Sequence, residues 1–350
     1  VGSSVNRADV LSVKAPSPDR TTPPCRYANR EGCGGCDFQH ISVTRQRSLK
    51  SEVIAEQFSR IAKMELQVEV EEINKPLGWR TRCTSVTTKN GALGFYQARS
   101  HKVIAVDDCR ILVPEMQFAQ LAERRAKGDQ KLEISISNTG ERSIATANSR
   151  DESPMRLTEG VDIAHYVVGE KTFEVSQKSF WQSHKDAPAT LTKAVLEYAG
   201  TREGDQVLDL YGGVGLFTAA LLPLVGESGS VDLVEGSKFA TSDAGRNFAD
   251  AKNVNIVTGD VAKVITRFPR ADVVVLDPPR EGAGKEVVEN LARIAPRTIV
   301  YVACDPAALA RDTAYLRDAG YKLDAIRAFD LFPMTHHIEC IAKFIPGKVS

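Results

Sequence analysis

From Phe173 to the C-terminus, short apolar runs alternate with stretches that have the length and periodicity of helices. This alternation constrains the fold more than any other feature of the chain, because it predicts a parallel α/β sheet. Ligands of such sheets bind at the carboxyl ends of the strands, where the strand order reverses. The expected strands are Gln206–Tyr211, Ser230–Glu235, Asn255–Thr258, Asp272–Asp277, Thr298–Ala303, Leu323–Phe329 and Ile338–Phe344, and the expected helices include Lys238–Ala251, Lys285–Ile294 and Pro306–Ala319.

The N-terminal half has a different pattern, in which short β-like runs are broken by Gly, Asn and Asp. We expect a tail and connector at 1–24, a small β-rich domain at 25–170 and the α/β domain at 171–350. Because the chain begins with valine rather than methionine, we expect it to be a fragment. The expected elements before the α/β domain are a strand at Ala8–Val13, a helix at Val43–Lys63, and strands at Leu66–Val70, Gly94–Tyr96, Val103–Val106, Leu132–Ile136 and Ser143–Thr146.

Composition excludes several classes of protein. The 45 Lys and Arg residues balance the 45 Asp and Glu residues, so no overall charge points to a nucleic-acid partner, although the first fifty residues are locally basic. No apolar run reaches the roughly 18 to 20 residues that span a bilayer, and no signal peptide is evident, so we expect a cytoplasmic protein without a membrane partner. Seven cysteines in such a chain indicate metal binding or catalysis rather than a disulfide framework.

A glycine turn follows the first strand of the α/β domain. In Val207–Gly215 a buried strand runs into this turn, where Gly213 lets the backbone approach a ligand, although the full dinucleotide fingerprint is missing. Glu235 ends the next strand, where an acid can accept both hydroxyls of a ribose, and Asp260 follows the third strand, within reach of an adenine amino group. Together these residues indicate an S-adenosylmethionine fold. The alternative is that they are only turn formers and helix caps.

Reactive groups follow the later strands. Asp277–Arg280 reads Asp-Pro-Pro-Arg. Base N-methyltransferases have an aromatic residue in the fourth place of a similar turn, so Arg280 disfavours amine methylation. DNA cytosine-C5 methylation is also disfavoured, because the nucleophilic cysteine of those enzymes follows this strand and no cysteine lies here. Cys304 precedes a helix, whose N-terminus is expected to lower the thiol pKa; the alternative is a buried core cysteine. Glu339 brings a carboxylate to the same edge of the sheet. His336 and His337 are competing bases.

These residues carry a family resemblance. Cys304–Asp312, Asp277–Arg280, Pro333–Glu339 and the Phe-x-Gln of Phe180–Gln182 resemble the RNA 5-methyluridine methyltransferase family, which includes bacterial tRNA and 23S rRNA uracil-C5 enzymes. The resemblance extends from about Ala8 to Phe344. The sequence departs from the commonest family pattern at His184 and Gly212, and neither change removes a reacting group; the spacing of seven residues between Cys25 and Cys33 also departs from the usual five.

The resemblance implies a Rossmann-like class I methyltransferase domain that methylates uridine C5 in RNA with S-adenosylmethionine. By this resemblance, Cys304 adds covalently to uracil C6 and Glu339 removes the C5 proton, because C5 is too weak a nucleophile to take a methyl group directly. The same matching assigns contacts with the cofactor to Gln182, Tyr211, Glu235 and Asp277; Gly213 and Asp260 are added by the strand argument above.

A cysteine cluster opens the β-rich domain. Cys25, Cys33 and Cys36 are close enough in sequence for one metal site, and zinc would satisfy this chemistry as well as iron and sulfide. The segment Cys33 to His40 resembles the iron-sulfur loop of the 23S rRNA enzymes, which implies a [4Fe-4S] cluster with Cys109 as fourth ligand. Cys83 is the main rival for that place, and Cys83 and Cys340 otherwise read as core thiols.

The resemblance also implies the partners. The cluster makes 23S rRNA the first expected substrate and tRNA the second, with the protein acting as a monomer. Residues 1–14 resemble the last strand of a β-barrel RNA-binding module found in the iron-sulfur group. Two alternatives stay open: an RNA-binding or assembly factor without turnover, and a small-molecule methyltransferase with a zinc-bound N-terminal knuckle.

Overall fold

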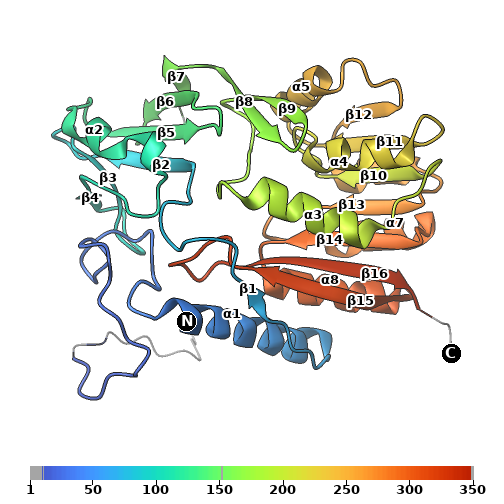
Figure 1. The fold of residues 1–350 in the computed structure, drawn as a ribbon, viewed down its shortest axis with the longest axis horizontal. Helices are drawn as coiled ribbons and strands as arrows, with labels where there is room; N and C mark the ends of the chain where they lie inside the picture. The colour runs from blue at the N-terminus through green and yellow to red at the C-terminus, as the bar shows by residue number, and fades with distance from the viewer. Residues whose placement is uncertain (1–9, 11, 151–152, 348–350) are drawn as a thin grey trace.

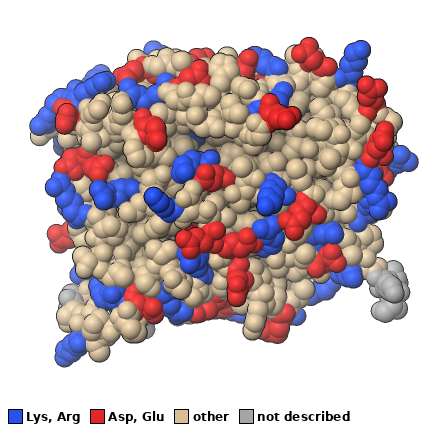
Figure 2. Space-filling model, viewed as in Figure 1, with Lys and Arg blue, Asp and Glu red and all other residues tan. Residues whose placement is uncertain are grey.

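The computed structural model describes residues 10, 12–150 and 153–347, so half of the strand predicted at Ala8–Val13 lies outside the described residues. Two sheet-based bodies lie side by side in Figure 1, a β-rich body and a larger α/β body. Lys and Arg side chains are interspersed with Asp and Glu over the face seen in Figure 2, in keeping with the balanced composition. None of the helices in the described ranges is long and apolar enough to cross a membrane.

The α/β body is built on an eight-stranded sheet with the order β1-β15-β16-β14-β13-β10-β11-β12. The predicted α/β sheet is confirmed, but it is mixed rather than wholly parallel, because β16 runs antiparallel to both of its neighbours. The connection between β15 and β16 is too short for the crossover that parallel pairing requires. The strands are β1 (Val70–Glu71), β10 (Gln206–Leu210), β11 (Ser230–Glu235), β12 (Val254–Thr258), β13 (Val273–Leu276), β14 (Thr298–Ala303), β15 (Tyr321–Phe329) and β16 (Glu339–Pro346).

Helices cover both faces of this sheet. On one face α7 and α8 pack over buried Leu208, Val274 and Tyr301, and on the other α3 and α4 pack over Val207 and Val275. This alternation of buried side chains follows from the period of two along each strand. The helices are α3 (Ala187–Ala199), α4 (Leu216–Val225), α5 (Lys238–Asn247), α6 (Val261–Val264), α7 (Gly284–Ile294) and α8 (Pro306–Asp318), with a short 3₁₀ turn at Ile265–Arg267.

The β-rich body contains a six-stranded antiparallel sheet with the order β4-β3-β2-β5-β6-β7, and a separate hairpin, β8–β9, leads into the α/β body. Sequence patterns did not reveal β2, β7, β8 or β9. The strands are β2 (Arg82–Thr87), β3 (Leu93–Tyr96), β4 (Val103–Ala105), β5 (Gln130–Ile136), β6 (Arg142–Asn148), β7 (Arg156–Gly160), β8 (Ile163–Val168) and β9 (Lys171–Ser176), and the short helices are a 3₁₀ turn at Pro114–Met116 and α2 (Phe118–Glu123).

The predicted helix at Val43–Lys63 is α1 (Val43–Gln57), which continues as a π-helical turn at Phe58–Ala62. It packs against the α/β body, since Ile54 and Phe58 are fully buried in the same core as α8. Strand β1 likewise extends the large sheet by pairing with β15. The segment between the cysteine cluster and the β-rich sheet therefore lies on the α/β body, while the division of the chain at 24 and 170 stays a prediction.

Candidate active site

The strand order reverses between β10 and β13, which are neighbours in the sheet although β11 and β12 lie between them in the chain. A crevice at the carboxyl ends of the strands is expected at such a point. Tyr211 follows β10 and Asp277 follows β13, so both stand at this crevice. The sequence argument had placed them at the same edge of the sheet.

The glycine turn has the backbone conformation that its sequence requires. Tyr211, Gly213 and Gly215 have φ angles of 60°, 56° and 96°, in the left-handed region. A Cβ atom on Gly215 would lie 2.2 Å from the ring of Phe248, so only glycine fits there. The amide of Gly213 donates to Oε2 of Glu235 over 3.1 Å, which brings two of the predicted cofactor residues together.

Asp260 and Gln182, two further predicted cofactor residues, make no hydrogen bond of this kind with the glycine turn among the described residues. Asp260 caps helix α6 by accepting from the amide of Ala262 over 3.1 Å, so it acts as a helix cap as well as standing beside the crevice. Burial, with the nearby Asp260 carboxylate, raises the pKa of Tyr211 to about 12. Gln182 is half-buried and lines a cavity of about 610 Å³ with His184. Within the described ranges no hydrogen bond joins Gln182 to the other predicted cofactor residues.

Cys304 and Glu339 meet because of the antiparallel strand. Ala303 at the end of β14 is paired with Cys340 in β16, so Cys304 and Glu339 both stand at the crevice edge of the sheet. Burial and the Asp277 carboxylate raise the pKa of Glu339 well above its usual value. Burial and its carboxylate neighbours raise the pKa of Asp277 to about 7. Asp277, Glu339 and the Cys304 thiol therefore interact electrostatically with one another.

The predicted lowering of the Cys304 pKa is wrong for this structure. Burial and the carboxylates of Glu339 and Asp277 raise the pKa of the thiol to about 11, and only the exposed Arg280 among its charged neighbours acts in the opposite direction. Desolvation and like charge thus outweigh the N-terminus of the helix that follows. With this pKa the thiol is protonated at neutral pH.

The two histidines before Glu339 are not equivalent. Burial, together with the neighbouring His336 and Arg280, lowers the pKa of His337 to about 4, so its ring is neutral at physiological pH. His336 is exposed and binds Asp37 through both its amide, at 3.0 Å, and its ring Nδ1, at 2.6 Å. His336 is therefore held by the cysteine loop, the loop at 33–38 that contains Cys33 and Cys36. Glu339 instead interacts electrostatically with Asp277.

One buried carboxylate at the crevice was missed by the sequence argument. Asp209, in the middle of β10, is fully buried and accepts from the amide and the hydroxyl of Thr218, at 2.9 and 2.7 Å. Its other oxygen, Oδ1, has no hydrogen-bond partner among the described residues, and burial raises its pKa to about 6. An acid inside an otherwise apolar strand, directly before the glycine turn, was the available signal.

The cysteine cluster of the sequence lines one cavity of about 280 Å³ beside the β-rich sheet. Gly34 and Gly35 form the tight turn between Cys33 and Cys36, and a Cβ on Gly34 would lie 2.5 Å from the amide nitrogen of Ala98. The thiols interact electrostatically, because burial and neighbouring thiol groups raise the pKa of Cys36 to about 11. The predicted ligands Cys25, Cys33, Cys36 and Cys109 all contribute to the cavity wall, as does Cys83.

Hydrogen bonds distinguish the two rival fourth ligands. The sulfur of Cys109 accepts hydrogen bonds from the backbone amides of Ile111 and Leu112, whereas the sulfur of Cys83 lies 3.9 Å from the sulfur of Met116. Amide donors stabilise a thiolate, so Cys109 fits a ligand position better. Cys340 is fully buried in the core. Among the described residues no group of three or more His, Cys, Asp or Glu side chains is placed to hold one metal ion.

Comparisons with known proteins identify the family of the chain. A family profile described as tRNA (uracil-5-)-methyltransferase matches residues 264–344. A Streptomyces avermitilis protein named as an uncharacterized RNA methyltransferase is 40% identical over 381 residues, covering 99% of this chain and 88% of its own length. A protein of the same description from Corynebacterium glutamicum is 32% identical, covering 97% of this chain and 85% of its own length.

Among solved structures, the Pyrococcus abyssi tRNA (uracil-54, C5)-methyltransferase bound to S-adenosyl-L-homocysteine has a TM-score of 0.71 with 24% identity, covering 89% of this chain and 86% of that chain. The chain therefore has the mixed α/β fold of this methyltransferase. The chain belongs to the RNA methyltransferase family that includes the tRNA (uracil-5-)-methyltransferases.

Proposed function

We propose that this enzyme methylates C5 of a uridine in RNA, with Cys304 as nucleophile and Glu339 as base. The observation that carries the proposal is the meeting of this thiol and this carboxylate at the carboxyl edge of the sheet, through the pairing of Ala303 with Cys340. An amine target needs no nucleophile of this kind. A thiol placed here has a use if the acceptor is a carbon that must first be activated.

The chemistry assigns one role to each group. The Cys304 thiolate adds to C6 of uracil and moves electron density onto C5 and O4, so that C5 becomes nucleophilic. C5 would then take the methyl group that S-adenosylmethionine supplies when bound, as the bond from this methyl to sulfur breaks and neutral S-adenosylhomocysteine leaves. Glu339 then takes the C5 proton, and the Cys304 sulfur is expelled as the C5–C6 double bond forms again. A carboxylate whose pKa is raised by burial and by the Asp277 carboxylate is a stronger base for that proton.

We assign the cofactor to the crevice around the switch point. Glu235 would accept the ribose hydroxyls and Asp260 the adenine amino group, with the glycine turn allowing close approach. The Asp277 carboxylate would face the positive sulfonium, which offsets the cost of its burial. The residues proposed to contact the cofactor are Gln182, Tyr211, Gly213, Glu235, Asp260 and Asp277.

We further propose that Cys25, Cys33, Cys36 and Cys109 hold a [4Fe-4S] cluster. All four cysteines contribute to the wall of one cavity, which supports a shared cluster, and the resemblance of Cys33 to His40 to the iron-sulfur loop favours iron and sulfide over zinc. The cluster would contribute to folding and to the shape of the RNA-binding surface, since no step above needs an electron. This reading favours 23S rRNA as substrate, with tRNA as the second candidate.

The mechanism is tested by two substitutions of the reacting groups. Cys304→Ala should abolish methylation, because no adduct can form. Glu339→Gln should form the adduct and fail to resolve it, leaving a protein–RNA species that survives a denaturing gel. Cys340→Ala, next to Glu339 but in the core, is the matched control and should retain turnover. Normal turnover by the Glu339→Gln variant would show that the base is assigned wrongly.

The substrate is tested with protein purified without oxygen. The enzyme is given methyl-labelled S-adenosylmethionine and either unmodified 23S rRNA or unmodified tRNA, and the nucleosides are separated by mass spectrometry. We expect labelled 5-methyluridine from the rRNA alone. Label in tRNA alone would overturn the choice of substrate and leave the reaction intact, whereas 5-methyluridine from neither RNA would overturn the proposed acceptor.

A further inference from the structure

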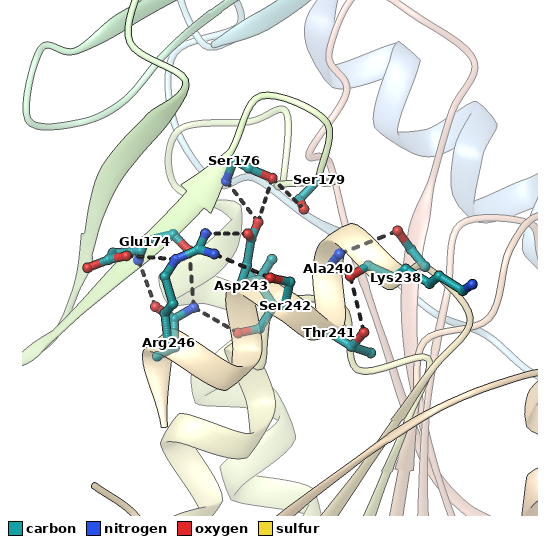
Figure 3. Close-up of polar contacts among 12 residues, drawn as sticks. Glu174, Ser176, Ser179, Lys238, Ala240, Thr241, Ser242, Asp243 and Arg246 are labelled. Carbon is teal, nitrogen blue, oxygen red and sulfur yellow. Dashed lines mark hydrogen bonds and ion pairs between the residues drawn. The ribbon is translucent and has the colours of Figure 1, made fainter. Parts of the chain in front are cut away.

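Helix α5 touches three segments that the proposed function places at the cofactor. It begins three residues after Glu235, and the Glu235 carboxylate accepts from the amide of Ser237, the N-cap of the helix, over 2.6 Å. Its C-terminal end reaches the glycine turn at Val214, and its middle lies along β9, the strand that leads to Phe180–Gln182. Figure 3 shows the polar contacts between α5 and this strand.

Asp243 is the buried charge in this interface. Its side chain is 2% exposed. Oδ2 accepts from the amide and the hydroxyl of Ser176, at 2.8 and 2.9 Å, and Oδ1 accepts from the Arg246 guanidinium. Arg246 also binds Glu174 in β9 over 2.9 Å. A buried carboxylate with all of these donors is held in one orientation, because losing any of them would leave it desolvated and unpaired.

The contact continues from Ser176 to the loop before Gln182. The hydroxyls of Ser176 and Ser179 lie 3.1 Å apart, and Ser179 is almost fully buried. Since the Ser176 hydroxyl donates its proton to Asp243, the Ser179 hydroxyl is the donor in this pair. Arg82, from β2 of the β-rich sheet, donates to the carbonyl of Ser179 over 2.9 Å. The start of the Phe180–Gln182 segment is therefore fixed from both sides.

Asn247 makes the second set of contacts. Its Oδ1 accepts from the amide of Glu174 over 2.7 Å, and its Nδ2 donates to the carbonyls of Glu174 and Val214, at 3.2 and 3.1 Å. The carboxamide thus pairs with β9 as another strand would, and at the same time holds the glycine turn. Both Asp243 and Asn247 lie on the buried face of α5, four residues apart.

We propose that Asp243 and Asn247 are positioning residues for the cofactor, which hold the loop before Gln182 and the glycine turn at a fixed separation across the crevice. The inference rests on the proposed function, since that is what assigns the two segments to one ligand. Neither residue touches the reacting atoms. Their effect is on affinity for the nucleoside, because a crevice whose two walls are already fixed loses less conformational freedom when the ligand binds.

The test compares variants at the two ends of the α/β sheet. Asp243→Ala removes the acceptor for Ser176, and Asp243→Asn keeps one oxygen for it. The matched control is Asp205→Ala, because Asp205 is also a buried acid that binds a backbone amide, of Arg202 at 2.6 Å, and an arginine, Arg297 at 2.8 Å. It stands before β10, at the opposite edge of the sheet from the crevice. Calorimetry gives the Kd for S-adenosylhomocysteine, filter binding gives the Kd for RNA, and circular dichroism gives the Tm.

We expect Asp243→Ala to raise the Kd for S-adenosylhomocysteine about tenfold, with little change in the Kd for RNA. Asp243→Asn should recover most of that affinity. Asp205→Ala should lower the Tm without changing the Kd for S-adenosylhomocysteine. Asn247→Ala and the milder Ser179→Ala should act in the same direction, and Ser179→Ala supplies the measurement if Asp243→Ala does not fold. An unchanged Kd in the folded variants, or an equal rise in the Asp205→Ala control, would overturn the inference. Failure of the unaltered enzyme to bind S-adenosylhomocysteine would instead overturn the cofactor assignment.

Discussion

The reactivity of Cys304 is set by its charged neighbours more than by its place before a helix. Its pKa is raised to about 11 by burial and by the Glu339 and Asp277 carboxylates, against the opposing effect of Arg280. The reactive thiolate is therefore a small fraction of the enzyme near neutral pH. At pH values below the pKa, the thiolate fraction rises about tenfold for each unit by which the pH increases.

Alkylation of Cys304 should follow this fraction. We expect the rate with iodoacetamide, measured by peptide mass spectrometry, to rise about tenfold for each pH unit between 7 and 9. Glu339→Gln should speed the reaction at pH 8, because removing a negative neighbour lowers the thiol pKa, and Arg280→Ala should slow it for the opposite reason. A rate that does not change between pH 6 and 9 would mean that the thiolate is already formed, and would contradict the raised pKa.

Lys50 and Asp330 form a second buried charge pair, with Nζ and Oδ1 2.6 Å apart and side chains 1% and 3% exposed. Lys50 also donates to the carbonyl of Phe332 over 3.1 Å. Lys50→Ala should lower the free energy of unfolding by about 3–5 kcal/mol, because it leaves Asp330 buried without a counter-charge. Urea denaturation measures the loss, and Lys50→Met combined with Asp330→Leu should recover most of it. A loss below about 1 kcal/mol for Lys50→Ala would show that water reaches Asp330.

At the scale of elements, helix α8 starts directly beside the proposed nucleophile. Asp305 caps it by accepting from the amide of Ala308 over 2.9 Å, and Pro306 fills the first helical position. Asp305→Ala should cost about 1 kcal/mol of stability and also slow methylation, because the backbone of Cys304 loses its anchor. The control is Ser42→Ala, which removes the cap of α1. The Ser42 Oγ accepts from the amide of Arg45 over 3.4 Å, and its loss should not slow methylation. Equal methylation rates in the two variants would show that the cap at Asp305 does not position Cys304.

Elements of the α/β body were predictable where one local signal dominated. β11 and β14 have the predicted bounds, because their apolar runs end at a turn or a cap. β9 was missed because Phe173 and Val175 are its only apolar residues, whereas β8 was missed although it is mostly apolar. The antiparallel direction of β16 depends on the length of the connection from β15, which a strand pattern alone does not report.

At the scale of the whole molecule, some site residues could be predicted from the sequence, while properties that depend on distant neighbours could not. Gly213 and Glu235 were found from order along the chain, and the structure joins them by a hydrogen bond. The raised pKa of Cys304 could not be predicted, since it depends on carboxylates 27 and 35 positions away in sequence. Asp243 gave no signal at all, because the value of a buried acid depends on which distant donors fold against it.

The cysteine loop and the segment before Glu339 form one hydrogen-bonded unit across the two bodies. Asp37 binds His336, the amide of Phe38 donates to the carbonyl of Met334 over 3.0 Å, and the amide of Met334 donates to Gln46 in α1 over 2.9 Å. Gln46 also donates to the carbonyl of Phe38 over 3.0 Å. A change in the conformation of the cysteine loop is therefore transmitted to the segment that carries the proposed base.

Removal of the proposed cluster should consequently loosen both segments together. After anaerobic iron chelation we expect faster amide hydrogen exchange in residues 33–38 and in 332–337, with little change in β5 and β6, and a lower yield of the adduct trapped by Glu339→Gln. Gln46→Ala, with the cluster in place, should reproduce the faster exchange at 332–337 because it cuts the shared contact. If chelation loosened residues 33–38 alone, the two bodies would be independent, and the cluster would act on RNA binding without affecting the base.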